Sequence, residues 1–168
     1  MKLIERSRTV TWEDPMIGAM SALVMTGLEY LQGIGNGDIP PPPIALLLGF
    51  ERPHVEEGRA VFELPVGEHL YNPIGSVHGG VLATLLDSAL GCAVHSTLPA
   101  GVGYTTVDLN TTYLRPVTRD SGVLRCEAET IHVGRKVATA RAQIFDGAGK
   151  LCATATTTCL ILRPEGVS

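Results

Sequence analysis

The stretch GSVHGGVLATLLDSALG, residues 75–91, brings together residue types that could act on a polarised carbonyl group. Gly79 and Gly80 stand just before a run of apolar residues at helical spacing, and Asp87 is the only acid within that run. Glycines at a helix start let the backbone approach a ligand closely, and the first N–H groups of a helix have no partner within it. At the positive end of the helix dipole, these N–H groups could polarise a carbonyl or hold a developing oxyanion.

Asp87 follows Gly79 by about two helical turns, or roughly 12 Å of rise. That separation is too long for both groups of one chain to hold the same atom with ease. We therefore expect at least a homodimer, in which Asp87 of one subunit faces the helix start of the other, and a dimer of dimers as the homotetramer. A structural interpretation stays open, in which Asp87 belongs to a partly exposed polar face with Thr84, Ser88 and Gly91.

The helix that must position these groups, residues 77–96, is apolar nearly all round, and such a helix has to be enclosed by other elements. After Pro99 and Gly101, four segments with the alternating pattern of strands run to Arg163. Short turns join them, so neighbouring strands must be antiparallel. We expect an α+β fold in which a long antiparallel sheet curls around one central helix. On the first of these strands, one predicted face carries Val107, Leu109 and Tyr113, and the other carries Thr106, Asp108 and Asn110.

The N-terminal part of the chain has a different pattern. Apolar residues at helical spacing predict one extra helix from Met16 to Leu31, and the prolines at Pro40–Pro43 predict a stiff extended connector. From Ile44 to Leu64 we expect two strands. The sequence therefore predicts an N-terminal extension, residues 1–43, followed by one domain, residues 44–168.

Composition limits the classes of partner that the protein is expected to bind. The 168 residues carry a net charge of −4, which argues against general nucleic-acid binding. No secretory signal precedes the first apolar run, and that run is too short to span a membrane. The four cysteines show no paired spacing, so we expect reduced thiols, a cytoplasmic protein and no metal site.

Three stretches resemble one known family. NPIGSVHGGVLATLLDSALG (residues 72–91), GYTTVDLNTTYLRPV and HVGRKVATARAQI are similar to the hotdog-fold acyl-CoA thioesterases of the phenylacetate-degradation, or PaaI-like, type. The resemblance covers roughly residues 44–162. It implies a hotdog fold and hydrolysis of an aryl or medium-chain acyl-CoA to a carboxylic acid and free coenzyme A. It implies no cofactor, since coenzyme A is part of the substrate.

The resemblance also implies roles for individual residues. Asp87 stands where the family has its catalytic carboxylate, as nucleophile or as base for water. Gly79 stands where a backbone N–H binds the thioester oxygen, and His78 beside it shapes that turn. Asn72 matches a polar residue that positions water or substrate, and Thr105 stands where the family has Ser or Thr near the carboxylate. Asn72 could equally be a turn residue, and His78 a structural hydrogen-bonding group.

Four basic residues could meet the phosphates of coenzyme A, by analogy and charge. They are Arg115, Arg119, Arg135 and Lys136. Each of them also has an ordinary interpretation, as part of a solvated surface.

Two other functions fit the same fold. A hotdog hydratase or dehydratase typically pairs a His with an acid, and His78 with Asp87 matches that arrangement less well. A non-catalytic acyl-CoA-binding module needs no acid in the helix, and a buried acid costs desolvation free energy. The release of free thiol from acyl-CoAs would separate the three possibilities.

Overall fold

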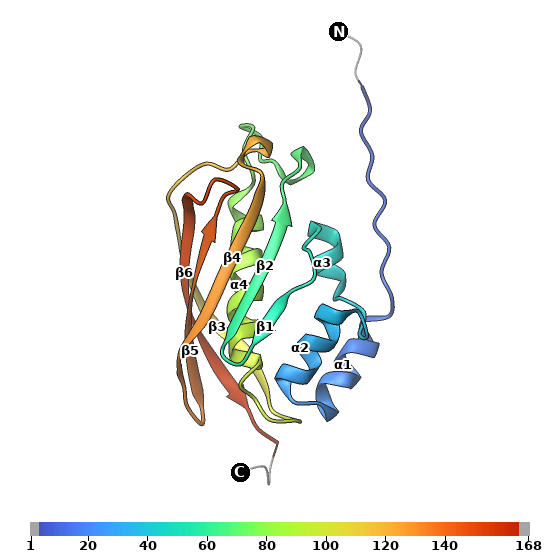
Figure 1. Ribbon diagram of the computed structural model, residues 1–168, viewed down its shortest axis with the longest axis vertical. Helices are drawn as coiled ribbons and strands as arrows, with labels where there is room; N and C mark the ends of the chain where they lie inside the picture. Colours follow the sequence, from blue (N-terminus) through green and yellow to red (C-terminus); the bar gives the residue numbers. More distant parts are fainter. Residues whose placement is uncertain (1–3, 165–168) are drawn as a thin grey trace.

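A six-stranded antiparallel sheet curls around one long helix, α4 (Gly79–His95), in a computed structural model that describes residues 4–164 (Figure 1). The strand order is β1-β2-β4-β5-β6-β3, so β1 and β3 form the two edges. This is the α+β hotdog arrangement that the sequence predicts. The strands are β1 (His54–Glu56), β2 (Arg59–Pro65), β3 (Gly103–Tyr113), β4 (Val123–Val133), β5 (Val137–Phe145) and β6 (Leu151–Leu162). The outermost residues of the predicted 1–43 and 44–168 ranges, 1–3 and 165–168, lie outside the described part of the chain.

Helix α4 forms the centre of the core and packs against every strand of the sheet. It begins and ends within two residues of the predicted range, with His78 as its N-cap. The enclosure of this helix confirms what its apolar surface predicts, because a helix of that kind must lose contact with water on most sides. Its buried residues are Leu82, Leu85, Leu86, Ala89, Leu90, Gly91, Ala93 and Val94.

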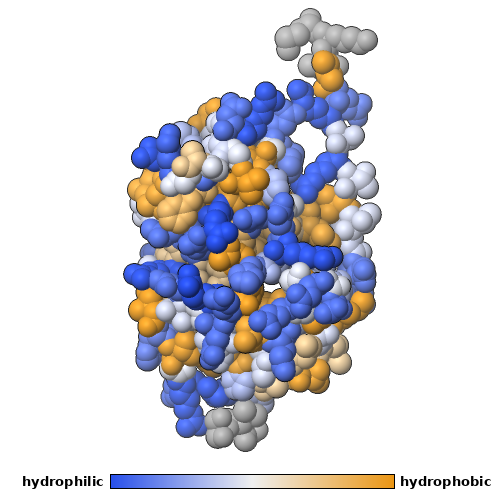
Figure 2. Space-filling model, viewed as in Figure 1, coloured by the Kyte–Doolittle hydropathy of each residue, from blue (hydrophilic) through white to orange (hydrophobic). Residues whose placement is uncertain are grey.

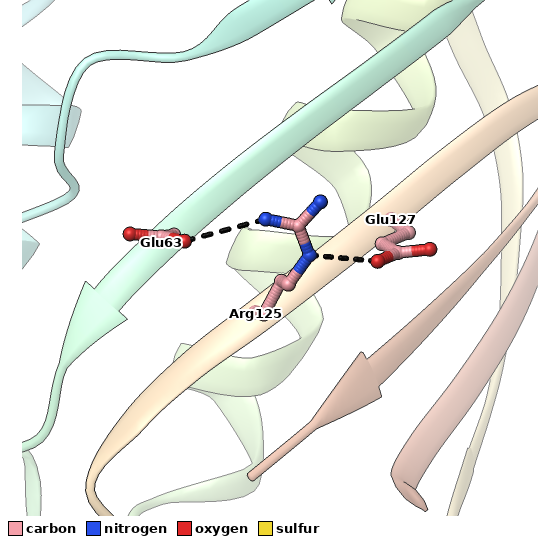
Figure 3. A network of polar contacts seen from close by, with 3 residues as sticks. All are labelled: Glu63, Arg125 and Glu127. Atoms are coloured by element: carbon pink, nitrogen blue, oxygen red, sulfur yellow. Dashed lines mark hydrogen bonds and ion pairs between the residues drawn. The ribbon is translucent and has the colours of Figure 1, made fainter. Parts of the chain in front are cut away.

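Strand β4 separates an apolar inner face from a charged outer face. Leu124 and Cys126 are fully buried, and β4 packs against α4. Arg125, on the outer face, donates from Nε to Glu127 at 2.7 Å and from Nη1 to Glu63 on β2 at 3.4 Å (Figure 3). Hydrophilic side chains gather over β2 and β4 on this face (Figure 2). The predicted alternation is confirmed here, because only the inner face meets the helix.

Strand β3 pairs with β6 alone, so its other edge has no strand partner among residues 4–164. Its register shifts between Thr106 and Asp108, which makes Val107 the extra residue of a β-bulge. The bulge interrupts the alternation, so Thr106 lies toward α4 and Val107 is 63% exposed. The prediction that Val107 shares the face of Leu109, opposite Thr106, is therefore wrong.

The N-terminal segment forms more helix than the sequence predicts. Instead of one helix, it contains α1 (Pro15–Val24) and α2 (Gly27–Asn36). The break lies at Thr26, whose side chain caps α2 in a reciprocal hydrogen-bonding arrangement with Glu29. Leu31 on α2 is buried in the same core as α4.

A third helix, α3 (Pro43–Leu48), replaces the first of the two strands predicted between Ile44 and Leu64. Pro43 occupies the first turn of α3, where its fixed φ and missing N–H suit a helix start. The two observed strands, β1 and β2, lie later in the chain and are joined by a turn at Gly58, which has φ 74°. Two single-turn 3-10 helices, η1 (Glu68–Leu70) and η2 (Arg119–Ser121), complete the connections.

Candidate active site

Asp87 lies half-buried in the middle of α4, beside the edge strand β3. Thr106 donates a hydrogen bond from Oγ1 to Asp87 Oδ1 at 3.0 Å. A hydrogen bond to an ionised acceptor is stronger than one between neutral groups, so this contact orients the carboxylate. The sequence predicts Thr105 near the carboxylate, but the hydrogen bond to Asp87 comes from the next residue, Thr106. Successive side chains of a strand point to opposite faces, so only one of the two can meet Asp87.

Gly79 begins α4, and its backbone N–H has no hydrogen-bond partner among the described residues. Its carbonyl accepts a hydrogen bond of 2.9 Å from the hydroxyl of Tyr113, at the far end of β3. A Cβ atom at position 79 would lie 3.3 Å from the Tyr113 ring, so a side chain there would crowd the tyrosine. The helix start therefore presents a free N–H donor at a close-packed turn, which suits an oxyanion or a carbonyl oxygen.

His78 and Asn72 build the turn before α4. His78 Nδ1 accepts a hydrogen bond of 2.9 Å from the N–H of Gly80. Asn72 Oδ1 accepts from the N–H groups of Ile74 and Ser76, at 3.0 and 3.2 Å, and Asn72 Nδ2 donates to Ser76 Oγ at 2.9 Å. Both polar ends of Asn72 are thus engaged within the turn. Through these contacts, the two side chains stabilise the turn from which α4 begins.

Strand β3 runs antiparallel to α4 and contacts it at both ends of the site. Tyr113 meets Gly79, and Thr106 meets Asp87 about two helical turns away. One subunit therefore holds the free N–H and the carboxylate at separate places along the same edge strand.

The four basic residues lie at opposite ends of the sheet. Tyr113 is level with Ala153, so Arg115 and Arg119 follow β3 at the end where α4 begins. Arg135 and Lys136 lie in the β4–β5 hairpin, and the register of β5 against β6 places that hairpin at the other end. Within one subunit the structure therefore brings together two pairs of basic residues, not one cluster.

A cavity of about 730 Å³ lies beside Asp87, between α4 and the N-terminal helices. From α4 it is lined by Asp87, Ser88, Cys92 and His95. From the other side it is lined mainly by apolar residues of α2, α3, the segment after α3, and β2, including Leu31, Ile34, Ala45, Phe50 and Phe62. Such a space accepts an apolar group that ends at the carboxylate.

Burial keeps three titratable groups of the cavity lining, Cys92, His95 and Tyr104, neutral near pH 7. It raises the pKa of the Cys92 thiol to about 12, with a smaller contribution from the negative charge of Asp87. Burial raises the pKa of Tyr104 well above its usual value, and it lowers the pKa of His95. A protonated thiol, a phenol and a neutral imidazole therefore surround the space beside the carboxylate.

Sequence reasoning did not identify several residues of the candidate site. Thr106 and Tyr113 carry no local signal, because their contacts depend on how β3 lies against α4. His95 follows Asp87 by about two turns, a spacing that places both on one face of a helix and could have identified it.

No group of three or more possible metal ligands occurs within residues 4–164. The four cysteines are all free thiols. Among the described helices, none combines the length and the apolar character that crossing a bilayer requires.

Comparison with known proteins places these features in a family. Residues 74–153 match the family model described as "Thioesterase superfamily". A Halobacterium salinarum protein that bears an esterase name is 38% identical over 102 residues, which make up 58% of this chain and 66% of that protein. The 1,4-dihydroxy-2-naphthoyl-CoA hydrolase of Listeria monocytogenes is 29% identical over 104 residues, 62% of this chain and 83% of the hydrolase.

A solved structure supports the same relationship. The phenylacetic acid degradation-related protein of Ralstonia eutropha superposes with a TM-score of 0.71 and 32% sequence identity. The superposition covers 78% of this chain and 98% of that protein. About a fifth of this chain lies outside the superposition.

Proposed function

This chain belongs to the thioesterase superfamily, and from that premise we propose that it hydrolyses an acyl-CoA to a carboxylic acid and free coenzyme A. One observation carries the proposal. Asp87 is held by Thr106 at the side of an apolar cavity that is large enough for an aryl or medium-chain acyl group. A carboxylate next to a space for the acyl group is what thioester hydrolysis without a metal requires.

In this proposal Asp87 either attacks the thioester carbon or removes a proton from an attacking water. In both cases water supplies the new carboxylate oxygen, the C–S bond breaks, and the thiolate of coenzyme A takes up a proton. The N–H of Gly79 stabilises the oxyanion of the tetrahedral intermediate. His78 and Asn72 keep that N–H in place through their hydrogen bonds in the preceding turn.

We place the complete site between two subunits. The free edge of β3 can pair with its own copy, and a two-fold axis makes such a pair antiparallel. An axis near the middle of β3 sets Thr106 of one subunit level with the partner subunit's Tyr113. Asp87 then lies near the partner subunit's Gly79, which removes the separation found within one chain. The same pairing sets the Arg115 end of one sheet beside the hairpin end of the other.

The basic residues then have a role in binding coenzyme A. Arg115 and Arg119 lie near the helix start, and both side chains are exposed. In the two-fold pair, the partner subunit's Arg135 and Lys136 lie beside this end of the sheet. We assign the phosphates of coenzyme A to this mixed group.

Residues 44–168 form the thioesterase domain, and residues 1–43 an extension that covers the cavity. The four free thiols suit a reducing compartment, the cytoplasm.

Free thiol released from a panel of aryl-CoAs and medium-chain acyl-CoAs tests the function. We expect turnover of at least one thioester without added metal or cofactor. A protein that binds these compounds without releasing thiol would be an acyl-CoA-binding module instead. Addition of water to an enoyl-CoA with the thioester left intact would identify a hydratase.

A further inference from the structure

We propose that helix α1 of each subunit packs on a second copy of this chain and covers the start of the partner's helix α4. The proposal rests on the proposed thioesterase function and on the two-fold pair that completes its site. It assigns a binding partner to the apolar face of α1, which the described part of one chain leaves exposed.

Helix α1 carries its large apolar side chains on one face, and that face is turned to solvent. Their spacing along the helix places them within about a third of its circumference. They are Met16, Ile17, Met20, Leu23 and Val24, and all five are exposed. The residue that α1 buries is Gly18, on the opposite side. An amphipathic helix of a monomer turns its large apolar residues to the core, so α1 has the reverse orientation.

The small inner face gives α1 little packing of its own. A Cβ atom on Gly18 would lie 3.3 Å from the hydroxyl of Tyr30, so α1 approaches α2 closely through a residue without a side chain. A ten-residue helix is marginal in water unless an apolar face packs against another surface. A contiguous exposed apolar face of this kind marks a surface that binds another molecule.

Helix α1 lies beside the candidate site and beside the start of the free edge strand. Ala22 of α1 lines the same cavity as Asp87. A Cβ atom on Gly101, two residues before β3 begins, would lie 3.8 Å from the carbonyl oxygen of Leu23. The end of α1 is therefore next to the start of β3, on the outer side of α2 (Figure 1).

A second exposed apolar patch lies at the other end of β3. Tyr113 ends this strand, donates its hydroxyl to the Gly79 carbonyl and is half-exposed. Leu114 follows it and is exposed as well. Ile74, in the turn before α4, is 87% exposed. One subunit thus has an apolar patch at each end of its free edge, and the second patch surrounds the helix start.

The two-fold pair brings unlike patches together. Because the paired β3 strands are antiparallel, the start of β3 lies beside the end of the partner's β3. Helix α1 then faces the partner's Ile74 and the partner's Leu114. The symmetry repeats this contact, since each subunit gives one α1 and receives one. Both exposed patches are buried by the same operation that brings Asp87 near the partner subunit's Gly79.

The charges around α1 favour this partner over a lipid membrane. Helices that lie on anionic membranes carry Lys and Arg on their polar face. Helix α1 contains neither residue type, and the exposed acids Glu13 and Asp14 precede it. Acidic groups next to the apolar face would be repelled by an anionic membrane.

This packing gives α1 a role in the partner's site. An apolar helix over the turn that contains Ile74 excludes water from the neighbourhood of the Gly79 N–H. Hydrogen bonds to an oxyanion become stronger when water is excluded. Helix α1 is a cover that touches no reacting atom, so its loss should slow hydrolysis without changing the reaction.

A cross-link tests the contact directly. The variant carrying both Val24→Cys and Leu114→Cys is treated with a short bismaleimide, and its mass is read by denaturing electrophoresis. We expect a covalent dimer. Each single variant is a matched control and should stay monomeric, because the two-fold pair places identical positions at opposite ends of β3. A product within one chain, or no product, would overturn the proposal.

A charged substitution tests the consequence for activity. Val24→Lys should lower kcat/KM at least about tenfold and weaken the dimer, because the lysine would be buried against the partner. Ile4→Lys is the matched control, since Ile4 and Val24 are both 77% exposed within one chain. It should keep kcat/KM and assembly within about twofold, well below the effect of a buried charge. Equal effects in the two variants would contradict the burial of α1.

The outcomes separate this proposal from the proposed function. An active dimer without the cross-link would overturn the cover and leave the shared thioesterase site intact. A cross-linked dimer that hydrolyses no thioester would support the packing of α1 and contradict the thioesterase function. Sedimentation with phosphatidylcholine–phosphatidylglycerol vesicles, lost in Val24→Lys and without a cross-link, would assign the face to a membrane and overturn the proposal.

Discussion

The contact between Asp87 and Thr106 is the smallest unit of the candidate site. The carboxylate is half-buried, so it keeps some contact with water while one oxygen is held by a hydroxyl. A carboxylate held in this way is fixed in direction and still reached by water, which a nucleophile or a base for water requires.

Asp87→Asn should lower kcat by about 10²- to 10⁴-fold on the best thioester. Asparagine is nearly isosteric with aspartate but cannot act as nucleophile or base. KM should stay unchanged or fall, because Gly79 and the basic contacts are untouched, and the melting temperature should hold or rise. Steady-state thiol release and thermal unfolding measure these values.

Asp38→Asn provides the matched control, because Asp38 is an exposed carboxylate just after the C-cap of α2. It should retain normal kcat. More than about a tenth of the original turnover in Asp87→Asn, below the usual effect of a proton-transfer group, would show that another residue is catalytic.

Thr106→Val should reduce kcat by about 5- to 30-fold, since it removes a hydrogen bond to a charged group and keeps the side-chain shape. Thr105→Val makes the same change one residue away on the other face of β3 and should leave kcat within about twofold, well below the effect of a lost hydrogen bond. The two variants are compared under identical conditions. Equal losses in both would argue that the strand, and not the hydroxyl at position 106, supports Asp87.

At the scale of elements, α2 and α4 are joined by an unusually close contact. Gly27 donates its N–H to the carbonyl of Leu98 at 3.0 Å, and a Cβ atom on Gly27 would overlap the backbone carbonyl of His95. Backbone atoms cannot rotate away as a flexible side chain can. The start of α2 therefore depends on glycine.

Gly27→Ala should destabilise the protein by about 1–3 kcal/mol or more, the usual cost of forcing extra atoms into a packed site. Gly103→Ala adds the same methyl group where the nearest atom is 4.0 Å away and should change little. Chemical denaturation of both variants gives the two free energies of unfolding. No difference between them would mean that α2 can shift away from α4 at little cost.

Deletion of residues 1–38 tests the role of the N-terminal helices. Leu31 and Ile34 belong to the main core, so their loss should expose apolar surface and lower solubility. The cavity also loses a wall, so the preference for acyl length should change while the reaction stays thioester hydrolysis. Loss of all hydrolysis in a folded truncation with the original assembly state would show that the extension belongs to the catalytic machinery.

At the scale of the whole molecule, the main feature is the free edge of β3, which pairs with no other described strand of the same chain. An eleven-residue edge strand presents a row of backbone groups that can pair with another strand. We expect at least a dimer, and a dimer of dimers, by light scattering at micromolar concentration.

Val107→Lys should weaken the dimer and lower thioesterase activity in parallel, because a lysine on an exposed edge opposes strand pairing. Val107 is 63% exposed and lies on this edge. Val137→Lys places the same charge on β5, inside the sheet order, at a valine that is 41% exposed, and should retain both properties. A fully active monomer would exclude a site shared between subunits.

The sequence by itself determined the features that depend on local periodicity. The apolar surface of residues 77–96 required an enclosing sheet, and the alternation along β4 predicted that Leu124, Cys126 and Ala128 face inward. Gly79 at a helix start and Asp87 within the helix were also visible, because helix caps and a lone acid are local patterns. The short apolar run after Pro43 was ambiguous, since such a run suits a strand or a helix equally.

Only the tertiary structure decided which distant residues meet. A bulge at Val107 set Thr106 toward α4, and one extra residue in a strand leaves no mark in the alternation pattern. The meeting of Tyr30, His95 and Tyr104 depends on how α2, α4 and β3 pack together. Periodicity specifies the face on which a residue lies, whereas register and packing between separate elements specify what that face touches.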